Sequence, residues 1–363
     1  MPRLLPKLLA LVAVFAAFAI GIAWYGATVP PYVGDLTRLG GYSEDDFGWT
    51  EPQARFDPPL YHAHRYDAPV DVLIFGDSMS LHRSGEQTDP GSYWPNYLAA
   101  RTGWRVAALH RHDWTLDDVL QHAVYRQAPP RVLIVQFAER AIVGLERITA
   151  GYGNGSGCDG AATPVFDPLP LRPLGRQPLP LPPPRPSARG VDFSLGAHHL
   201  KRRVLTQLLP SAWQPVRRFA LDRAGLFSSR RDRELLVFAD DLRKLDMTPD
   251  QLARQRCALR EIQDAVQASG KTVLLVLVVP DKLSTYRAHL PALPPDYPEV
   301  PALLAAAGGL QLVRVDRVFD AAVKAGVRDL FLPNDTHPGV AGHRLIADAV
   351  MHSLRELGIV VDD

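Results

Sequence analysis

Short apolar segments alternate with helix-type segments along this 363-residue chain, and this alternation is what most constrains its fold. Five apolar runs are typical of strands buried on both faces: 72–75, 106–109, 132–137, 273–279 and 312–315. Helix patterns occupy 93–101, 115–127, 248–270 and 340–357. The sequence therefore predicts an α/β three-layer sandwich with a mostly parallel five-stranded sheet. In such folds ligands bind at the carboxyl ends of the strands.

The N-terminus predicts a membrane anchor over residues 1–30. Arg3 and Lys7 precede an uncharged apolar run of eighteen residues that begins at Leu8 and ends with Trp24 and Tyr25. At 1.5 Å per residue this run nearly spans a hydrocarbon core of about 30 Å, and the two aromatic rings suit the interface. Positive charge before the run predicts a single pass through a membrane, with the N-terminus in the cytoplasm and everything after Pro30 outside it. A cleaved signal peptide is the alternative, and it also exports the chain.

Composition divides the rest of the chain into segments. Residues 31–68 have weak periodicity and are interpreted as a linker and lead-in, and 69–149 as the first half of the α/β domain. Many of the 33 prolines fall within 150–235, which predicts an insertion whose proline-rich part is extended and on the surface. Its later part, 191–235, is basic and compatible with helix, either as a solvated face or in contact with lipid headgroups or a membrane partner. Residues 236–363 form the second half of the domain.

Charge and cysteine content limit the possible partners. The 40 basic and 39 acidic residues nearly cancel, so no overall field favours nucleic acid. Cys158 and Cys257 are the only two cysteines, and export predicts that they form one disulfide, with two buried thiols as the alternative. No histidine spacing indicates a metal site, and we expect no cofactor.

Two segments lie where such a sheet needs its catalytic groups. Ser78 follows the first strand within Gly76-Asp77-Ser78, where backbone N–H groups can stabilise an oxyanion. Asp335 and His337 precede the last helix, with one residue between them. A serine hydroxyl needs a base such as histidine, and the base needs a carboxylate to orient it. Each segment alone is compatible with a turn or a helix N-cap, but together they predict a Ser78–His337–Asp335 triad.

This arrangement resembles the SGNH (GDSL) hydrolase superfamily over about residues 70–145 and 245–357. The one-residue gap between Asp335 and His337 is similar to the alginate O-acetyltransferase (AlgX/AlgJ-like) branch, since ordinary members have two residues there. Two further stretches resemble that branch: Phe137-Ala138-Glu139-Arg140, and Val279-Pro280-Asp281-Lys282 with Tyr286 and Leu290. The chain departs from it in placing the serine segment first and Pro338 where tryptophan is usual.

The oxyanion positions also depart from the superfamily pattern. Its second-block glycine and third-block asparagine are not recognisable, so the N–H of Ser78 is the first expected donor. Arg140 is a candidate for positioning the acyl group or the oxyanion, and a surface pair with Glu139 is its alternative role. Trp94 and Trp114 are candidates for binding sugar faces, with core packing expected for at least one of them.

The resemblance implies an O-acetyltransferase that acts on an exported polysaccharide through Ser78, His337 and Asp335. It also implies a single pass through a bacterial inner membrane with the catalytic domain in the periplasm, and a membrane-bound O-acyltransferase in the inner membrane as the partner that supplies acetyl groups. A carbohydrate esterase or deacetylase would use the same triad with water as the acceptor. A polysaccharide-binding scaffold without catalytic activity is the third possibility.

Overall fold

Five parallel strands form the central sheet of the computed structural model, which describes residues 4–29, 31–82, 88–147, 168–181, 191–208, 214–293, 297–306 and 308–360. The strands are β2 (Val72–Gly76), β3 (Val106–His110), β4 (Val132–Ala138), β8 (Val273–Val279) and β9 (Leu312–Val313). Their order is β3-β2-β4-β8-β9, and every neighbouring pair is parallel. The chain moves to one side of β2 to form β3 and to the other side to form β4. This reversal places a topological switch point, where α/β folds bind ligands, at the end of β2.

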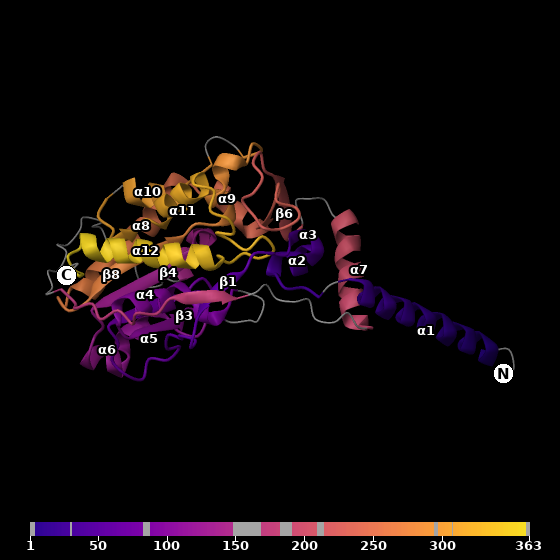
Figure 1. Cartoon of the computed structure of the whole chain (residues 1–363), viewed down its shortest axis with the longest axis horizontal. Helices are drawn as coiled ribbons and strands as arrows, with labels where there is room; N and C mark the ends of the chain where they lie inside the picture. The colour runs from indigo at the N-terminus through magenta and orange to yellow at the C-terminus, as the bar shows by residue number, and fades with distance from the viewer. Residues whose placement is uncertain are drawn as a thin grey trace.

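Helices cover both faces of the sheet, as Figure 1 shows. On one face lie α4 (Trp94–Thr102), α11 (Val315–Lys324) and α12 (Val340–Glu356), and on the other lie α5 (Leu116–Gln121), α8 (Pro249–Gln267) and α10 (Val300–Ala306). Alternate residues of β4 serve the two cores: Val132 and Ile134 pack in the first, and Leu133 and Val135 in the second. The predicted three-layer fold is therefore confirmed.

Several shorter helical elements connect these helices and strands. They are α6 (Ala123–Gln127), α9 (Lys282–Thr285), and the 3-10 segments η1 (Pro90–Ser92), η2 (Glu139–Arg147), η4 (Ala239–Asp246) and η5 (Arg287–His289). The helix predicted over 115–127 is divided, because His122 adopts an extended conformation between α5 and α6. The last strand is shorter than predicted, because α11 begins at Val315.

A capping box begins α8, at the start of the helix predicted over 248–270. Thr248 Oγ1 accepts a hydrogen bond from the N–H of Gln251 at 3.2 Å, and Gln251 Oε1 accepts one from the N–H of Thr248 at 2.8 Å. Pro249 occupies the first turn, where its missing N–H costs no helical hydrogen bond. This boundary was predictable because its signals are local.

The described parts of the proline-rich and basic segments contain strands and a helix. β5 (Pro178–Leu181) pairs antiparallel with β1 (Gln53–Phe56), in a two-stranded edge sheet that tolerates proline. Within 191–235, which the sequence left compatible with helix, the described residues form α7 (Phe193–Leu208) and then β6 (Val216–Ala220), which pairs antiparallel with β7 (Glu234–Phe238). Within β6 Val216 is buried, Arg217 and Phe219 are partly exposed, and Arg218 and Ala220 are exposed, so the strand shows no clear pattern of alternating burial.

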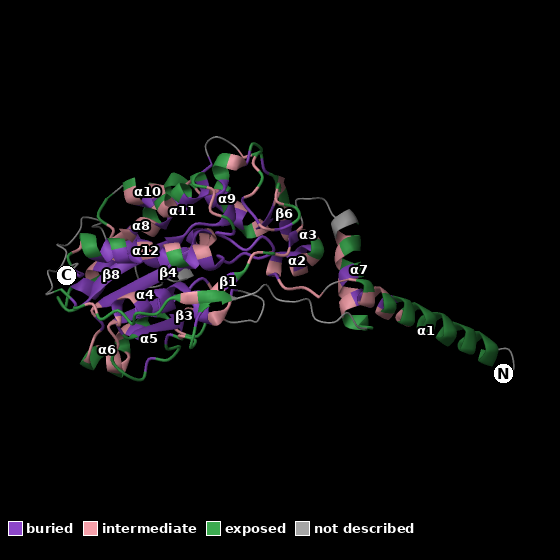
Figure 2. Cartoon of the chain, in the orientation of Figure 1, coloured by how far each residue is buried: buried purple, intermediate pink, exposed green. Residues whose placement is uncertain are grey.

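The N-terminal helix α1 (Leu4–Thr28) extends away from the α/β domain with most of its side chains exposed (Figure 2). It is 25 residues long and contains an 18-residue window with a mean hydropathy of 2.4, so by length and composition it can cross a membrane once, as an anchor or as a signal segment. Its C-terminal end packs against α7. Next in the chain come α2 (Asp35–Gly40) and α3 (Glu44–Phe47), which lie beside the strand ends in Figure 1.

Candidate active site

Ser78 lies in the turn that follows β2, at the carboxyl edge of the sheet. Its Oγ is 2.8 Å from Nε2 of His337, although 259 positions separate the two residues in the chain. Among the described residues, none accepts a hydrogen bond from the N–H of Ser78. At Gly76, which ends the strand, a Cβ atom would lie 2.6 Å from Oε1 of Gln136, so only glycine fits there.

A buried polar network fixes this turn. Gln136 of β4 accepts hydrogen bonds from the N–H of Asp77 at 3.0 Å and from the hydroxyl of Ser80 at 2.6 Å. Its amide also donates to Asp77 Oδ1 at 3.0 Å. The other oxygen of Asp77 accepts the N–H of Ala138. Gln136 is 1% exposed, and a polar residue within an otherwise apolar strand is the sequence signal that would have identified it.

Asp335 and His337 lie in the loop before α12. Asp335 Oδ1 is 2.5 Å from Nδ1 of His337 and also accepts the N–H of His337 at 2.9 Å. The structure therefore brings the three predicted residues into one hydrogen-bonded chain, Ser78–His337–Asp335. Both loop side chains are almost fully buried, while Ser78 is partly exposed. A proton can pass between the hydroxyl and the imidazole in this geometry.

The electrostatics of the loop suit this arrangement. Burial disfavours the imidazolium form of His337, but the neighbouring Asp335 carboxylate outweighs it, so the pKa of His337 is raised. Burial opposes ionisation of Asp335 too, yet His337 and three hydrogen bonds hold the pKa of Asp335 below its ordinary value. Asp335 is therefore ionised near neutral pH and able to stabilise a protonated His337.

Asp35 contributes a second carboxylate to the site. It accepts hydrogen bonds from the N–H and the hydroxyl of Thr336 at 2.8 and 2.5 Å, and its own N–H donates to Asp335 Oδ2 at 2.9 Å. The N–H groups of Leu36 and Thr37 donate to the carbonyl of Asn334. The segment 31–68, predicted as a linker and lead-in, thus holds the loop that carries Asp335 and His337 in place through these hydrogen bonds. Nothing in its sequence pattern singles out Asp35.

Lys282 also supports the loop that carries Asp335 and His337. Its Nζ donates to the carbonyls of Leu332, Pro333 and Asp335 at 2.9, 3.1 and 3.1 Å, and the residue is 1% exposed. Burial lowers the pKa of Lys282 to about 8, although Asp335 favours its charged form. This lysine belongs to the Val279–Lys282 stretch, and the structure shows that it acts by holding loop carbonyls.

Arg140 pairs with Asp241 of η4, whose Oδ1 lies 3.3 Å from Nη1. The alternative of a surface pair with Glu139 is wrong, because Glu139 is fully buried and binds Lys244 Nζ at 2.9 Å. The positive charge of Arg140 acts on the active site, since it opposes protonation of His337. Burial and the nearby Asp281 raise the pKa of Asp241 to about 7, despite the attraction of Arg140.

Of the two tryptophans, at least one of which was expected to pack in the core, Trp94 does so, while a sugar-binding role for Trp114 stays a prediction. Trp94 is 0% exposed and its indole Nε1 donates to Ser80 Oγ at 3.1 Å, so it packs in the core and supports the nucleophile turn. Trp114 is partly buried against the second core, with its ring edge-on to His122 at 5.5 Å.

Cys257 lies buried on α8, whereas Cys158 is outside the described residues, so their disulfide stays a prediction.

Asp35, Asp335 and His337 place three potential metal-ligand atoms within 4.8 Å of one another. Both imidazole nitrogens are engaged, with Asp335 and with Ser78, and the oxygens of Asp35 accept hydrogen bonds from Thr336. The nitrogen and oxygen atoms that could bind a metal thus already take part in hydrogen bonds, and this favours proton transfer over metal binding.

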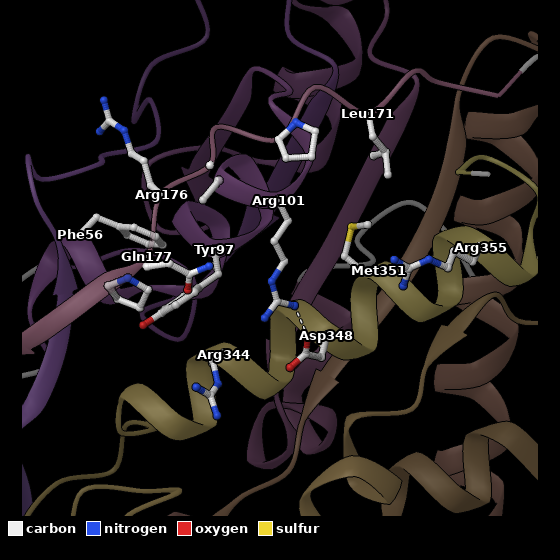
Figure 3. A pocket seen from close by; sticks show the side chains of 14 residues that line it. Phe56, Tyr97, Arg101, Leu171, Arg176, Gln177, Arg344, Asp348, Met351 and Arg355 are labelled. Carbon is white, nitrogen blue, oxygen red and sulfur yellow. Dashed lines mark hydrogen bonds and ion pairs between the residues drawn. The ribbon is translucent and has the colours of Figure 1, made fainter. Parts of the chain in front are cut away.

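A cavity of about 510 Å³ lies apart from the triad, between α4, α12 and the segment before β5. Figure 3 shows Arg101 of α4 reaching Asp348 of α12, and the two form an ion pair. The lining also contains Arg176, Arg344 and Arg355, with the rings of Tyr97 and Phe56, but no triad residue. Its arginines suit a negatively charged ligand, and the lining offers no nucleophile with an adjacent base.

The parallel sheet and the serine–histidine–aspartate chain are the fold and the site geometry of SGNH-type α/β enzymes, which carry out acyl transfer or ester hydrolysis. Residues 236–361, about a third of the chain, match the family model of the SGNH hydrolase-like domain of acetyltransferase AlgX. This match includes Asp335 and His337 and leaves Ser78 outside. It confirms the resemblance to the AlgX-like branch of the SGNH superfamily.

Solved structures of esterases and hydrolases are more distantly similar. LAE5, an alpha/beta hydrolase from the metagenome of Lake Arreo, is 13% identical with a TM-score of 0.34, over 82% of this chain and 99% of its own. A catalytic mutant of the acetylxylan esterase Axe2 from Geobacillus stearothermophilus is 12% identical with a TM-score of 0.35, over the same shares. Scores this low carry no weight beside the topology and site geometry. No curated protein sequence matches the chain significantly.

Proposed function

We propose that this protein is an O-acetyltransferase that moves an acetyl group through Ser78 onto hydroxyl groups of an exported polysaccharide. The observation that carries the proposal is the hydrogen-bonded chain Ser78–His337–Asp335, whose last two members lie within the AlgX-type match. The buried turn and the braced loop hold these groups in place before substrate arrives, as an efficient acyl-transfer site requires.

In the first half-reaction, His337 Nε2 takes the proton of Ser78 as its Oγ attacks the acetyl carbonyl of the donor. The N–H of Ser78 stabilises the resulting oxyanion, and the positive charge of Arg140 adds to the field at the site. Asp335 stabilises the imidazolium meanwhile. His337 then returns the proton to the leaving group of the donor, and the acetyl group remains on Ser78 as an ester.

In the second half-reaction, a sugar hydroxyl of the polysaccharide replaces the donor. His337 takes its proton while the sugar oxygen attacks the acetyl-serine, and then protonates Ser78 Oγ as that oxygen leaves. Water in place of the sugar gives an esterase by the same steps. The choice between the two activities thus depends on which acceptor reaches the acetyl-serine.

The site lies close to the predicted membrane span. Only seven residue steps separate Thr28, the last residue of α1, from Asp35, which touches the triad loop. A fully extended chain of that length covers at most about 25 Å. A donor delivered through the inner membrane by a membrane-bound O-acyltransferase would therefore emerge near Ser78, with the catalytic domain in the periplasm. The packing of α1 against α7 favours a retained anchor over a cleaved signal peptide.

The test offers the purified full chain a chromogenic acetyl ester with and without an acceptor oligosaccharide, and analyses the sugar by mass spectrometry. An acetylated sugar that is absent with Ser78→Ala supports the transferase. Release of acetate alone, at a rate that the oligosaccharide does not change, makes the protein an esterase. Sugar binding without turnover of the ester makes it a scaffold.

The partner is tested separately in cells. Residues 1–30 are replaced by a cleavable signal peptide, and acetylation of the polymer is measured. Dependence on a membrane-bound donor predicts that the released form loses acetylation while the purified form still cleaves the soluble ester. Full acetylation by the released form would contradict a donor partner in the membrane.

A further inference from the structure

The helix α7 crosses the C-terminal end of α1, as Figure 1 shows. Their backbones touch: a Cβ atom on Gly196 would lie 2.1 Å from the carbonyl oxygen of Ile22, and one on Gly26 would lie 2.0 Å from that of Asp192. Such small-residue crossings let two helices approach closely. Since α1 ends at Thr28, α7 lies at the level where the span leaves the bilayer.

The helix α7 has two dissimilar faces. On one, the His198 ring contacts the carbonyl of Arg38 at 3.1 Å and the His199 ring stacks on Tyr32 at 4.1 Å, so this face contacts the chain around α2. The other face is an exposed apolar stripe, spaced by seven, four and four residues and therefore on one side of the helix. It consists of Phe193, Leu200, Val204 and Leu208, which are 51, 36, 41 and 75% exposed.

Exposed cations border this stripe. At 3.6 residues per turn, Lys201 and Arg203 lie about 80° to either side of the direction of Phe193. Both residues are exposed. An apolar stripe flanked by lysine and arginine is typical of helices that lie in the membrane interface, where apolar side chains enter the acyl boundary and cations meet lipid phosphates.

We propose that α7 is an interfacial helix, seated on the phospholipid surface of the same bilayer that α1 spans. The position of α7 across the end of the span, its stripe facing away from α2 and its flanking cations all fit this single occupant. Two contacts with the bilayer, α1 through it and α7 along it, restrict how the catalytic domain can rotate. The carboxyl edge of the sheet, next to α2, is then held near the membrane. This inference does not depend on the proposed activity.

The experiment uses the full chain reconstituted in vesicles of phosphatidylethanolamine and phosphatidylglycerol. A nitroxide label is attached at Val204→Cys, and the matched control is Leu303→Cys on α10, because Leu303 is 43% exposed and Val204 is 41% exposed. Electron paramagnetic resonance compares the access of dissolved oxygen, which concentrates in lipid, with that of a water-soluble nickel chelate. The unsubstituted chain gives the background from the native cysteines, and circular dichroism checks that both variants fold.

We expect oxygen to relax the Val204 label several-fold more effectively than nickel does, and the reverse for the Leu303 label. Equal nickel access at the two positions would overturn the proposal by showing that the stripe faces water. Protection of the Val204 label from both reagents would also overturn it, because the stripe would then be covered by protein, such as a second copy of the chain.

Discussion

Replacing Gln136 by leucine should separate the positioning of the nucleophile from the integrity of the fold. Gln136 is 1% exposed and makes three hydrogen bonds: it accepts from Asp77 N–H and Ser80 Oγ and donates to the Asp77 carboxylate. Leucine has a similar size but can form none of them. The buried N–H and hydroxyl then lack an acceptor, and the carboxylate loses a donor.

The size of the effect follows from these bonds. Two neutral hydrogen bonds contribute about 1 kcal/mol each and the charge-assisted one about 1.5–3 kcal/mol. Burial of leucine instead of an amide returns about 1 kcal/mol, so Gln136→Leu should lower the free energy of unfolding by about 2–4 kcal/mol. A shift of about 1 Å in the Ser78 turn should lower kcat/KM by about a hundredfold.

The control is Gln263→Leu, the same substitution on α8, away from the triad. Gln263 is 2% exposed, donates to the carbonyl of Gly309 at 3.1 Å and accepts from the N–H of Gln311 at 2.8 Å. Urea unfolding should show it destabilised by about 1 kcal/mol, since it loses two neutral hydrogen bonds and no charge-assisted one, while kcat/KM for a chromogenic acetyl ester, per folded molecule, stays at the wild-type value. Equal activity losses in the two variants would refute the assigned role of Gln136, and so would a folded Gln136→Leu enzyme with wild-type activity.

Two further predictions use charge and covalent structure. The base His337 must be neutral to take a proton, so kcat/KM should rise as the pH passes the pKa of His337, and this rise is the acidic limb of the pH profile. Arg140→Gln removes a cation that lowers the pKa of His337, so the acidic limb should move to higher pH. Asp35→Asn removes an anion that raises the pKa of His337, so the acidic limb should move to lower pH. A shift of the acidic limb in the same direction in both variants would contradict this account. Non-reducing mass spectrometry of the exported protein should show a Cys158–Cys257 disulfide, which is worth about 3–5 kcal/mol for a loop of about a hundred residues; two free thiols would exclude it.

The sheet and the triad were predictable because their signals are strong and local. Fully apolar runs such as Val273–Val279 have no other stable place than a strand buried on both faces. Ser78 and the Asp335–His337 pair were identifiable because parallel strands end at one edge, so segments far apart in sequence meet there.

The supports of the triad were not predictable, because they depend on contacts between distant segments. Asp35 and Lys282 act on the loop through backbone groups, and such groups leave no pattern in the sequence. The sequence could not tell which of the two tryptophans packs in the core; the contacts show that it is Trp94, whose indole is buried against the nucleophile turn. The β6 strand was missed because its two adjacent arginines, Arg217 and Arg218, resemble a basic helix face.

The central claim is that acetyl groups pass through Ser78, and trapping the acyl-enzyme tests it most directly. The full chain is mixed with a chromogenic acetyl ester, quenched rapidly in acid and digested, and the peptides are analysed by mass spectrometry. We predict one acetyl group on the peptide that contains Ser78, on the serine itself, and none in the Ser78→Ala chain, which should remain folded but release no chromophore. Acetylation of another residue that turns over at the rate of ester cleavage, or wild-type ester cleavage by Ser78→Ala, would contradict it.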